Sequence, residues 1–135
     1  MKLVLYPFCG DINMTESVSI TSATLISSKK ITGSEVFNLA GEKLGTIEDL
    51  LVDKVSGRTI YAVLSFGGFL GVGERHHPLP WSTLTYDLAK SGYLVDLDKK
   101  TLEEAPSYGR NEEFSWTPEY GHKVDSFYKS PNYWN

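Results

Sequence analysis

Residues 61–74 constrain the fold more than any other part of the chain. From residue 58 to 66 both alternate sets of side chains are largely apolar, which predicts a strand in the centre of a sheet, because a surface strand would present polar residues to water on one face. Four glycines follow within residues 67–73 and predict a tight, shaped turn. Phe69 and Leu70, which lie between those glycines, must either fold back onto a core or contact a partner.

The flanking sequence predicts further short strands. Residues 43–53 form one candidate, in which the apolar alternation changes parity near Glu48 and Asp49 and therefore predicts a β-bulge. The turn at residues 53–58, with Gly57, joins this strand to the central one as a hairpin. Residues 75–81 contain two prolines and predict an edge or corner strand, which residues 82–86 continue.

The last strand is predicted at residues 93–97, after a turn. Residues 98–106 predict one or two helical turns, with Asp98 as the N-cap and a proline at the end. A second short helix is predicted at residues 119–129, where three apolar side chains recur at helical spacing. Short strands at close spacing, with few helices, predict an all-β barrel or sandwich.

The chain divides into three parts by composition. Residues 1–24 are rich in Ser and Thr and are expected to be poorly ordered, and either Met1 or Met14 is the true start. Residues 25–106 hold the predicted β domain and begin with a short β-prone piece. Residues 107–135 form an aromatic-rich tail that is expected to pack on the barrel or on a second subunit, since so much apolar area is unfavourable in water.

Composition and charge exclude several classes of protein. With 135 residues the chain has the length of one domain, and 13 basic against 17 acidic residues give a net charge of −4, which opposes nucleic acid as a partner. The single cysteine, Cys9, excludes an internal disulfide. No apolar run approaches the ~20 residues of a membrane span. We therefore expect a soluble, cytoplasmic protein.

Several residue patterns invite a catalytic or metal-binding interpretation. Glu74, His76 and His77 suggest a small metal-binding protein, but adjacent histidines on a strand point to opposite faces, and zinc needs three or four convergent ligands. The glycines at residues 67–73 lead to a proline-rich strand and not to the helix that a phosphate-binding loop requires. From the residues alone we expect no metal, no cofactor and no catalytic site.

Several motifs in one order carry a family resemblance over roughly residues 25–134. The chain resembles the PRC-barrel family, which is named from the cytoplasmic barrel of the photosynthetic reaction centre H subunit and includes a domain of a ribosome maturation factor. It is most similar to the stand-alone bacterial branch. The resemblance is carried by residues 36–50, 61–71, 77–84 and 92–97, and by the closing residues 128–134.

The resemblance implies a small, strongly bent antiparallel PRC-type β-barrel without typical catalytic residues. It also implies a non-catalytic role as a protein-binding or assembly module. The protein partner is unknown. Aromatic excess and open sheet edges predict self-association as a homodimer. The candidates for the interaction surface are Phe69, Leu70, Trp116, Tyr133 and Trp134. The alternatives are an RNA- or ribosome-associated maturation factor, which the acidic balance opposes, and the metal-binding protein described above.

Overall fold

The computed structural model describes residues 24–67, 73–109, 112 and 114–134. The chain divides into two units, Met1–Ile31 and Thr32–Asn135. In the first unit the described part contains helix α2 (Ser28–Ile31). The β-prone piece predicted before it is not a strand. The Ser27 carbonyl instead accepts the N–H groups of Lys30 and Ile31 and starts the helix. The expectation of disorder for residues 1–24 falls, apart from Thr24, outside the described residues.

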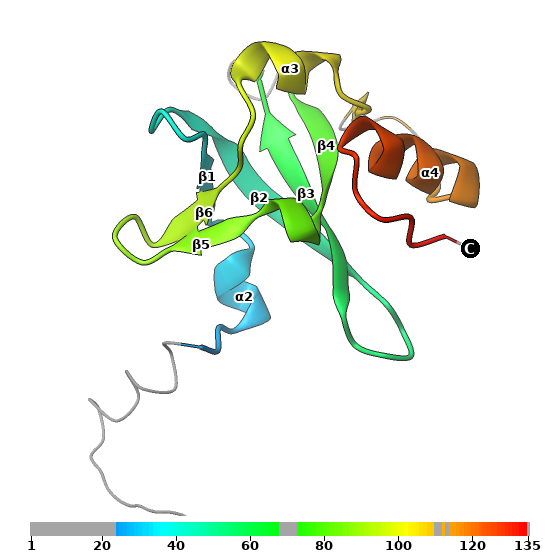
Figure 1. Ribbon diagram of the computed structural model, residues 1–135, viewed down its shortest axis with the longest axis horizontal. Coiled ribbons are helices and arrows are strands. Elements are labelled where there is room, and N and C mark those ends of the chain that lie inside the picture. Colours follow the sequence, from blue (N-terminus) through cyan, green and yellow to red (C-terminus); the bar gives the residue numbers. More distant parts are fainter. Residues whose placement is uncertain (1–23, 68–72, 110–111, 113, 135) are drawn as a thin grey trace, which may run out of the picture. The chain divides into compact units, whose positions relative to one another are not determined.

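The second unit is built on one sheet of seven strands within the described residues, in the order β5-β6-β1-β2-β3-β4-β7 (Figure 1). The prediction of a mostly β fold with short helices is confirmed, and the described sheet is open between β5 and β7. The strands are β1 (Glu35–Phe37), β2 (Lys43–Val52), β3 (Thr59–Phe66), β4 (Arg75–Pro80), β5 (Thr85–Asp87), β6 (Gly92–Leu94) and β7 (Tyr108–Gly109).

The central strand is β3, which pairs with β2 on one side and β4 on the other, as its two apolar faces predict. Its directly opposed residues define the two faces of the sheet, because opposed side chains lie on the same side. Ala62 and Leu64 face Leu79 and His77, and we call this the first face. Tyr61, Val63 and Ser65 lie on the second face, opposite Pro80, Pro78 and His76. Residues 61–65 are all buried.

Two local predictions for β2 are confirmed. Its pairing with β3 shifts register between Ile47 and Asp49, at the predicted bulge. The hairpin turn is closed by Asp53, whose N–H donates to the Arg58 carbonyl and whose carboxylate accepts the N–H groups of Val55 and Ser56. Gly57 has a φ of 78°, a conformation that favours glycine.

The expectation of an entirely antiparallel sheet is wrong at one place. Strand β6 runs parallel to β1, with Val36 opposite Tyr93. The chain leaves β4 at one side of the sheet, returns as the β5–β6 hairpin and docks beside β1. Because this connection crosses the sheet instead of turning tightly, the returning strand has the same direction as β1.

Strand β4 ends earlier than predicted, because the residues after Pro80 form a 3-10 turn, Trp81–Thr83, before β5 begins. The Thr83 hydroxyl donates to the Pro80 carbonyl at 2.7 Å and stabilises this turn. The edge position predicted for the prolines is found in part: β7 pairs only with Arg75 and His76. The proline half of β4 is therefore paired on the β3 side alone.

Two helices lie in the sequence before and after β7, both close to where the sequence predicts them. Helix α3 (Lys99–Glu104) begins at Asp98, whose carboxylate accepts the Thr101 N–H at 2.8 Å and whose pKa this bond lowers. Helix α4 (Pro118–Phe127) is capped by Thr117 and buries Val124 fully. Figure 1 shows α4 beside β4, with the C-terminal segment continuing from it along the same side.

Candidate functional site

The aromatic tail lies on the second face of β3. Trp116 stacks on the buried Tyr61 ring, with 4.9 Å between ring centroids. Trp134 stacks on the same ring from further away, at 6.5 Å. Trp116 and Trp134 follow Tyr61 in the sequence by 55 and 73 positions, and these contacts bring both onto the central strand. The second face is therefore buried by the tail of the same chain.

A chain of hydrogen bonds fixes the tail to Tyr61. The Tyr61 hydroxyl donates to Asp125 Oδ1 and accepts the Trp134 indole N–H, both at 2.7 Å. Asp125 Oδ2 accepts the backbone N–H of Tyr133 at 3.1 Å. Burial and the neighbouring carboxylate raise the pKa of Tyr61. Both oxygens of the buried Asp125 are thus satisfied inside the protein.

Helix α4 places Asp125 toward the sheet, and Gly121, one turn earlier, admits the Trp134 ring. A Cβ atom at Gly121 would overlap the Trp134 indole nitrogen. Glycine inside a helix costs about 1 kcal/mol relative to alanine. Here the cost is explained by the close approach of the Trp134 indole to the helix backbone.

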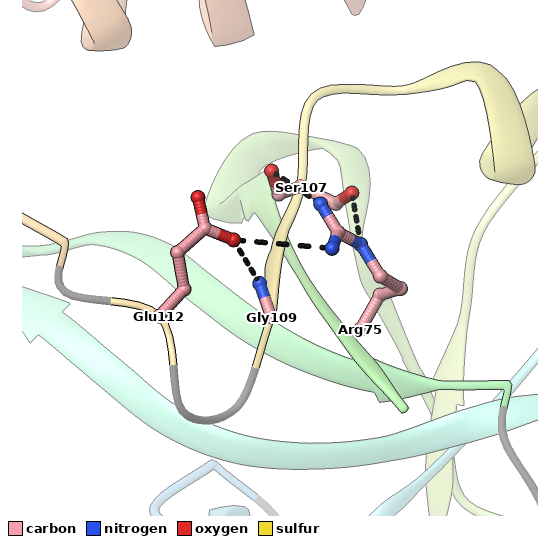
Figure 2. A network of polar contacts seen from close by, with 4 residues as sticks. All are labelled: Arg75, Ser107, Gly109 and Glu112. Atoms are coloured by element: carbon pink, nitrogen blue, oxygen red, sulfur yellow. Dashed lines mark hydrogen bonds and ion pairs between the residues drawn. The ribbon is translucent and has the colours of Figure 1, made fainter. Parts of the chain in front are cut away.

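A second group of aromatic rings continues from Trp116 toward β7. Tyr108 and Phe114 stack with centroids 4.0 Å apart, and Tyr108 also meets His76 edge-on. The segment that carries Tyr108 is attached to β4 by Arg75, which donates to the Ser107 side chain at 3.0 Å and to its carbonyl at 3.2 Å (Figure 2). Glu112 accepts the Gly109 N–H at 2.7 Å and lies 3.9 Å from the Arg75 guanidinium.

The outer end of the β2–β3 hairpin is exposed. Val55 is 97% exposed, Val52 49% and Tyr133 37%. The Tyr133 hydroxyl donates to the Asp53 carboxylate, so this tail residue is attached to the hairpin turn. Hydrogen bonds from the Ser56 backbone N–H, the Tyr133 hydroxyl and the Val55 backbone N–H lower the pKa of Asp53 to about 2. We call Val52, Val55 and Tyr133 the hairpin surface.

A pocket of about 680 Å³ opens where the start of β3, the end of β4 and the tail meet. It is lined by residues 58–60, 80–82 and 130–133 and by Asp125. Its apolar wall contains Ile60, Pro80 and the half-buried Trp81. The Ser82 and Ser130 hydroxyls lie 3.5 Å apart on its rim. Arg58 contributes a positive charge and forms no ion pair with another described residue.

Among the predicted interaction residues, the structure gathers Trp116, Tyr133 and Trp134 at one place, around Tyr61. Only Tyr133 of these three is exposed. The other two contact the same chain and are half-buried. Phe69 and Leu70 lie outside the described residues. All three contact other residues of the same chain, and their role in binding a partner stays a prediction.

The predicted metal residues are not brought together. His77 is buried on the first face against Phe66, whereas His76 lies on the second face against Tyr108. The Glu74 carboxylate accepts the Ser65 hydroxyl. No group of three metal-ligating side chains occurs in the part of the chain that the structure describes. The Nδ1 atom of the buried His77 has no hydrogen-bond partner among the described residues.

Three residues that matter here were missed from the sequence: Asp125, Gly121 and Arg58. A glycine within a helical pattern is a usable signal of close packing, and Gly121 had that signal. An aspartate on the buried side of a helix carries no comparable signal. The sequence places Arg58 in a predicted turn, and nothing local shows that the tail returns beside it.

Comparison with known proteins gives a family and little beyond it. The model of the PRC-barrel domain matches residues 23–102. No curated protein matches the chain. One solved structure that it resembles belongs to Pseudomonas aeruginosa and is described as a 16S ribosomal RNA processing protein, RimM, with 23% identity and a TM-score of 0.37. That match covers 58% of this chain and 48% of the other, so the chain spans about half the length of that protein.

None of the helices in the described residues has the length and hydrophobicity that crossing a membrane requires. The family match covers more than half of the chain and includes strands β1 to β6 and the start of α3. The order of motifs noted in the sequence and the mostly β architecture agree with that match. The chain belongs to the PRC-barrel domain family.

Proposed function

We propose that this protein is a non-catalytic protein-binding or assembly module that self-associates through the hairpin surface. The observation that carries the proposal is the exposure of Val52, Val55 and Tyr133 at one end of the molecule's longest hairpin. Figure 1 shows this hairpin extending past the strands beside it. Strand β1 pairs only with Lys43–Thr46 of β2, which leaves the outer half of β2 with β3 as its partner.

The contact is expected to use side chains and not an added strand. The Asp49 carboxylate accepts the Leu50 N–H at 2.8 Å, so a backbone donor on this edge is already occupied. Acidic residues and bulges on an edge strand are devices that oppose edge-to-edge pairing. The exposed side chains at the hairpin end have no comparable protection.

A second copy is the partner that the charges favour. A two-fold axis brings a surface against itself, so the surface must be self-complementary. The hairpin carries both signs, with Glu48 and Asp49 on β2 and Lys54 at the turn. Two copies related by a two-fold axis can therefore place the apolar residues together and opposite charges around them.

Light scattering after size exclusion, over a range of concentrations, tests the proposal. We expect twice the mass of one chain for the wild type and the mass of one chain for Val52→Asp/Val55→Asp. Leu88→Asp is the matched control, because Leu88 is 73% exposed on a different hairpin and its substitution leaves the mass unchanged. Phe69→Asp/Leu70→Asp tests the surface predicted from the sequence.

Three results would contradict the proposal. One is a single-chain mass for the wild type at every concentration. Another is loss of the dimer only with the Phe69/Leu70 pair. The third is co-sedimentation with ribosomal particles at moderate salt, which would favour the RNA-associated alternative that the net charge of −4 opposes.

A further inference from the structure

We propose that the pocket between β3, β4 and the tail binds a carboxylate carried on an apolar body. The apolar wall of the pocket is made of residues other than those of the hairpin surface, and Tyr133 is the one residue that the two have in common. Its volume of about 680 Å³ lies in the range of small-molecule sites. Nothing in the proposed self-association requires it to be filled.

The positive charge in the pocket comes from Arg58. Its guanidinium has no ion-pair partner among the described residues. The hydrogen bond to Asp53 raises the pKa of Tyr133, and the positive charge of Arg58 acts in the opposite direction. Because Tyr133 lines the pocket, the charge of Arg58 is felt at the pocket rim. A guanidinium binds a carboxylate through two parallel hydrogen bonds, which gives both strength and orientation.

The negative residue in the lining does not compete for a cationic ligand. Asp125 is 3% exposed, and its two oxygens accept the Tyr61 hydroxyl and the Tyr133 N–H. Each of its oxygens therefore already accepts a hydrogen bond inside the protein. Other polar groups of the lining include the Arg58 guanidinium, which is a donor, and the Ser82 and Ser130 hydroxyls, which lie 3.5 Å from each other.

The other wall selects the body of the ligand. Ile60, Pro80 and Trp81 supply an apolar surface next to the charged rim. Trp81 meets Tyr93 edge-on at 5.5 Å, which fixes its ring from behind. An aromatic or branched aliphatic group would cover this wall while its carboxylate reaches Arg58. Such a group is found in small aromatic acids and in peptide segments that place an acidic residue beside an apolar one.

Titration of the full-length protein followed by NMR tests the proposal, with benzoate as the probe and benzamide as its neutral counterpart. We expect benzoate to shift the Trp81 indole and Ser82 amide signals and to bind about tenfold more tightly than benzamide, as one charge-assisted pair implies. Arg58→Gln should remove that difference and Arg58→Lys should keep part of it. Lys54→Gln, a cation on the same turn outside the pocket, should change the benzoate affinity less than about twofold.

A second arm identifies the source of the carboxylate. A short peptide with glutamate beside phenylalanine is compared with benzoate, and tighter binding of the peptide assigns the pocket to a protein partner, whereas tighter binding of benzoate assigns it to a small acid. The proposal is overturned by equal affinity for benzoate and benzamide, by full benzoate binding to Arg58→Gln, or by no shift with either probe. Because Val52→Asp/Val55→Asp leaves the pocket wall intact, benzoate binding to that variant separates this proposal from the self-association.

Discussion

The two faces of β3 are both buried, but by different means. On the first face, Ala62 and Leu64 pack in an apolar layer to which the neighbouring strand contributes Leu79 and His77. On the second face, Tyr61 is covered by Trp116 and Trp134 from the tail and is hydrogen-bonded to Asp125. The first face sets side chains of neighbouring strands beside one another, whereas Tyr61 on the second face is covered by a segment that must return from far along the chain.

The difference shows which face should control the stability of the whole domain and which should control the attachment of the tail. Apolar packing is non-directional and scales with buried area. A complete polar network adds little to the net free energy of unfolding. Removal of one partner is costly, because the remaining groups stay buried and unsatisfied. We therefore expect the first face to govern global unfolding and the second to govern attachment of the tail.

Leu64→Ala gives the largest expected effect. Leu64 is fully buried on the first face, and such a truncation lowers the free energy of unfolding by about 2–5 kcal/mol through lost transfer energy and a residual cavity. Urea unfolding followed by circular dichroism measures it. An effect below that of Asp125→Ala would show that the tail, and not the sheet, carries the stability.

Stability should also fall on mild acidification because of His77. Burial lowers the pKa of His77 to about 4 from the ordinary 6.5. The neutral form is thus favoured in the folded state, so this contribution is complete above pH 6.5 and is lost as the pH falls from 6.5 through 4. The largest loss is roughly 3 kcal/mol. Unfolding between pH 7 and 5 isolates it from Asp53, whose lowered pKa acts below that range.

His77→Leu is the control for the pH effect. It keeps the site apolar and removes the titrating group, so the slope of stability against pH between 7 and 5 should flatten. An unchanged slope would assign the acid sensitivity to another group and break the link between the first face and pH.

Asp125→Ala has a smaller and more local effect. It leaves the Tyr61 hydroxyl and the Tyr133 N–H without their acceptor, which costs about 1–3 kcal/mol. Hydrogen exchange should show faster exchange in residues 130–134 while β3 stays protected. Ser126→Ala, on the exposed side of the same helix, is the matched control and should change stability by less than about 0.5 kcal/mol. Equal loss of protection in β3 would mean that the two faces unfold as one unit.

Local sequence was sufficient for much of the fold. The run of residues that is apolar on both faces predicted the central position of β3. The change of parity at Glu48 and Asp49 predicted the bulge. Asp98 and the following residues gave α3 with its cap. In each case the signal lies within a few residues of the structure it specifies, since caps, turns and alternation act through short-range geometry.

The tertiary structure alone decided the rest. The parallel pairing of β6 with β1, the contact of Trp134 with Gly121 and the pocket around Arg58 all join residues that are far apart in the sequence. The aromatic content of the tail indicated that it must be covered, but not where. Which face receives it depends on the path of the whole chain and on complementary shape, and neither is encoded in any single stretch of residues.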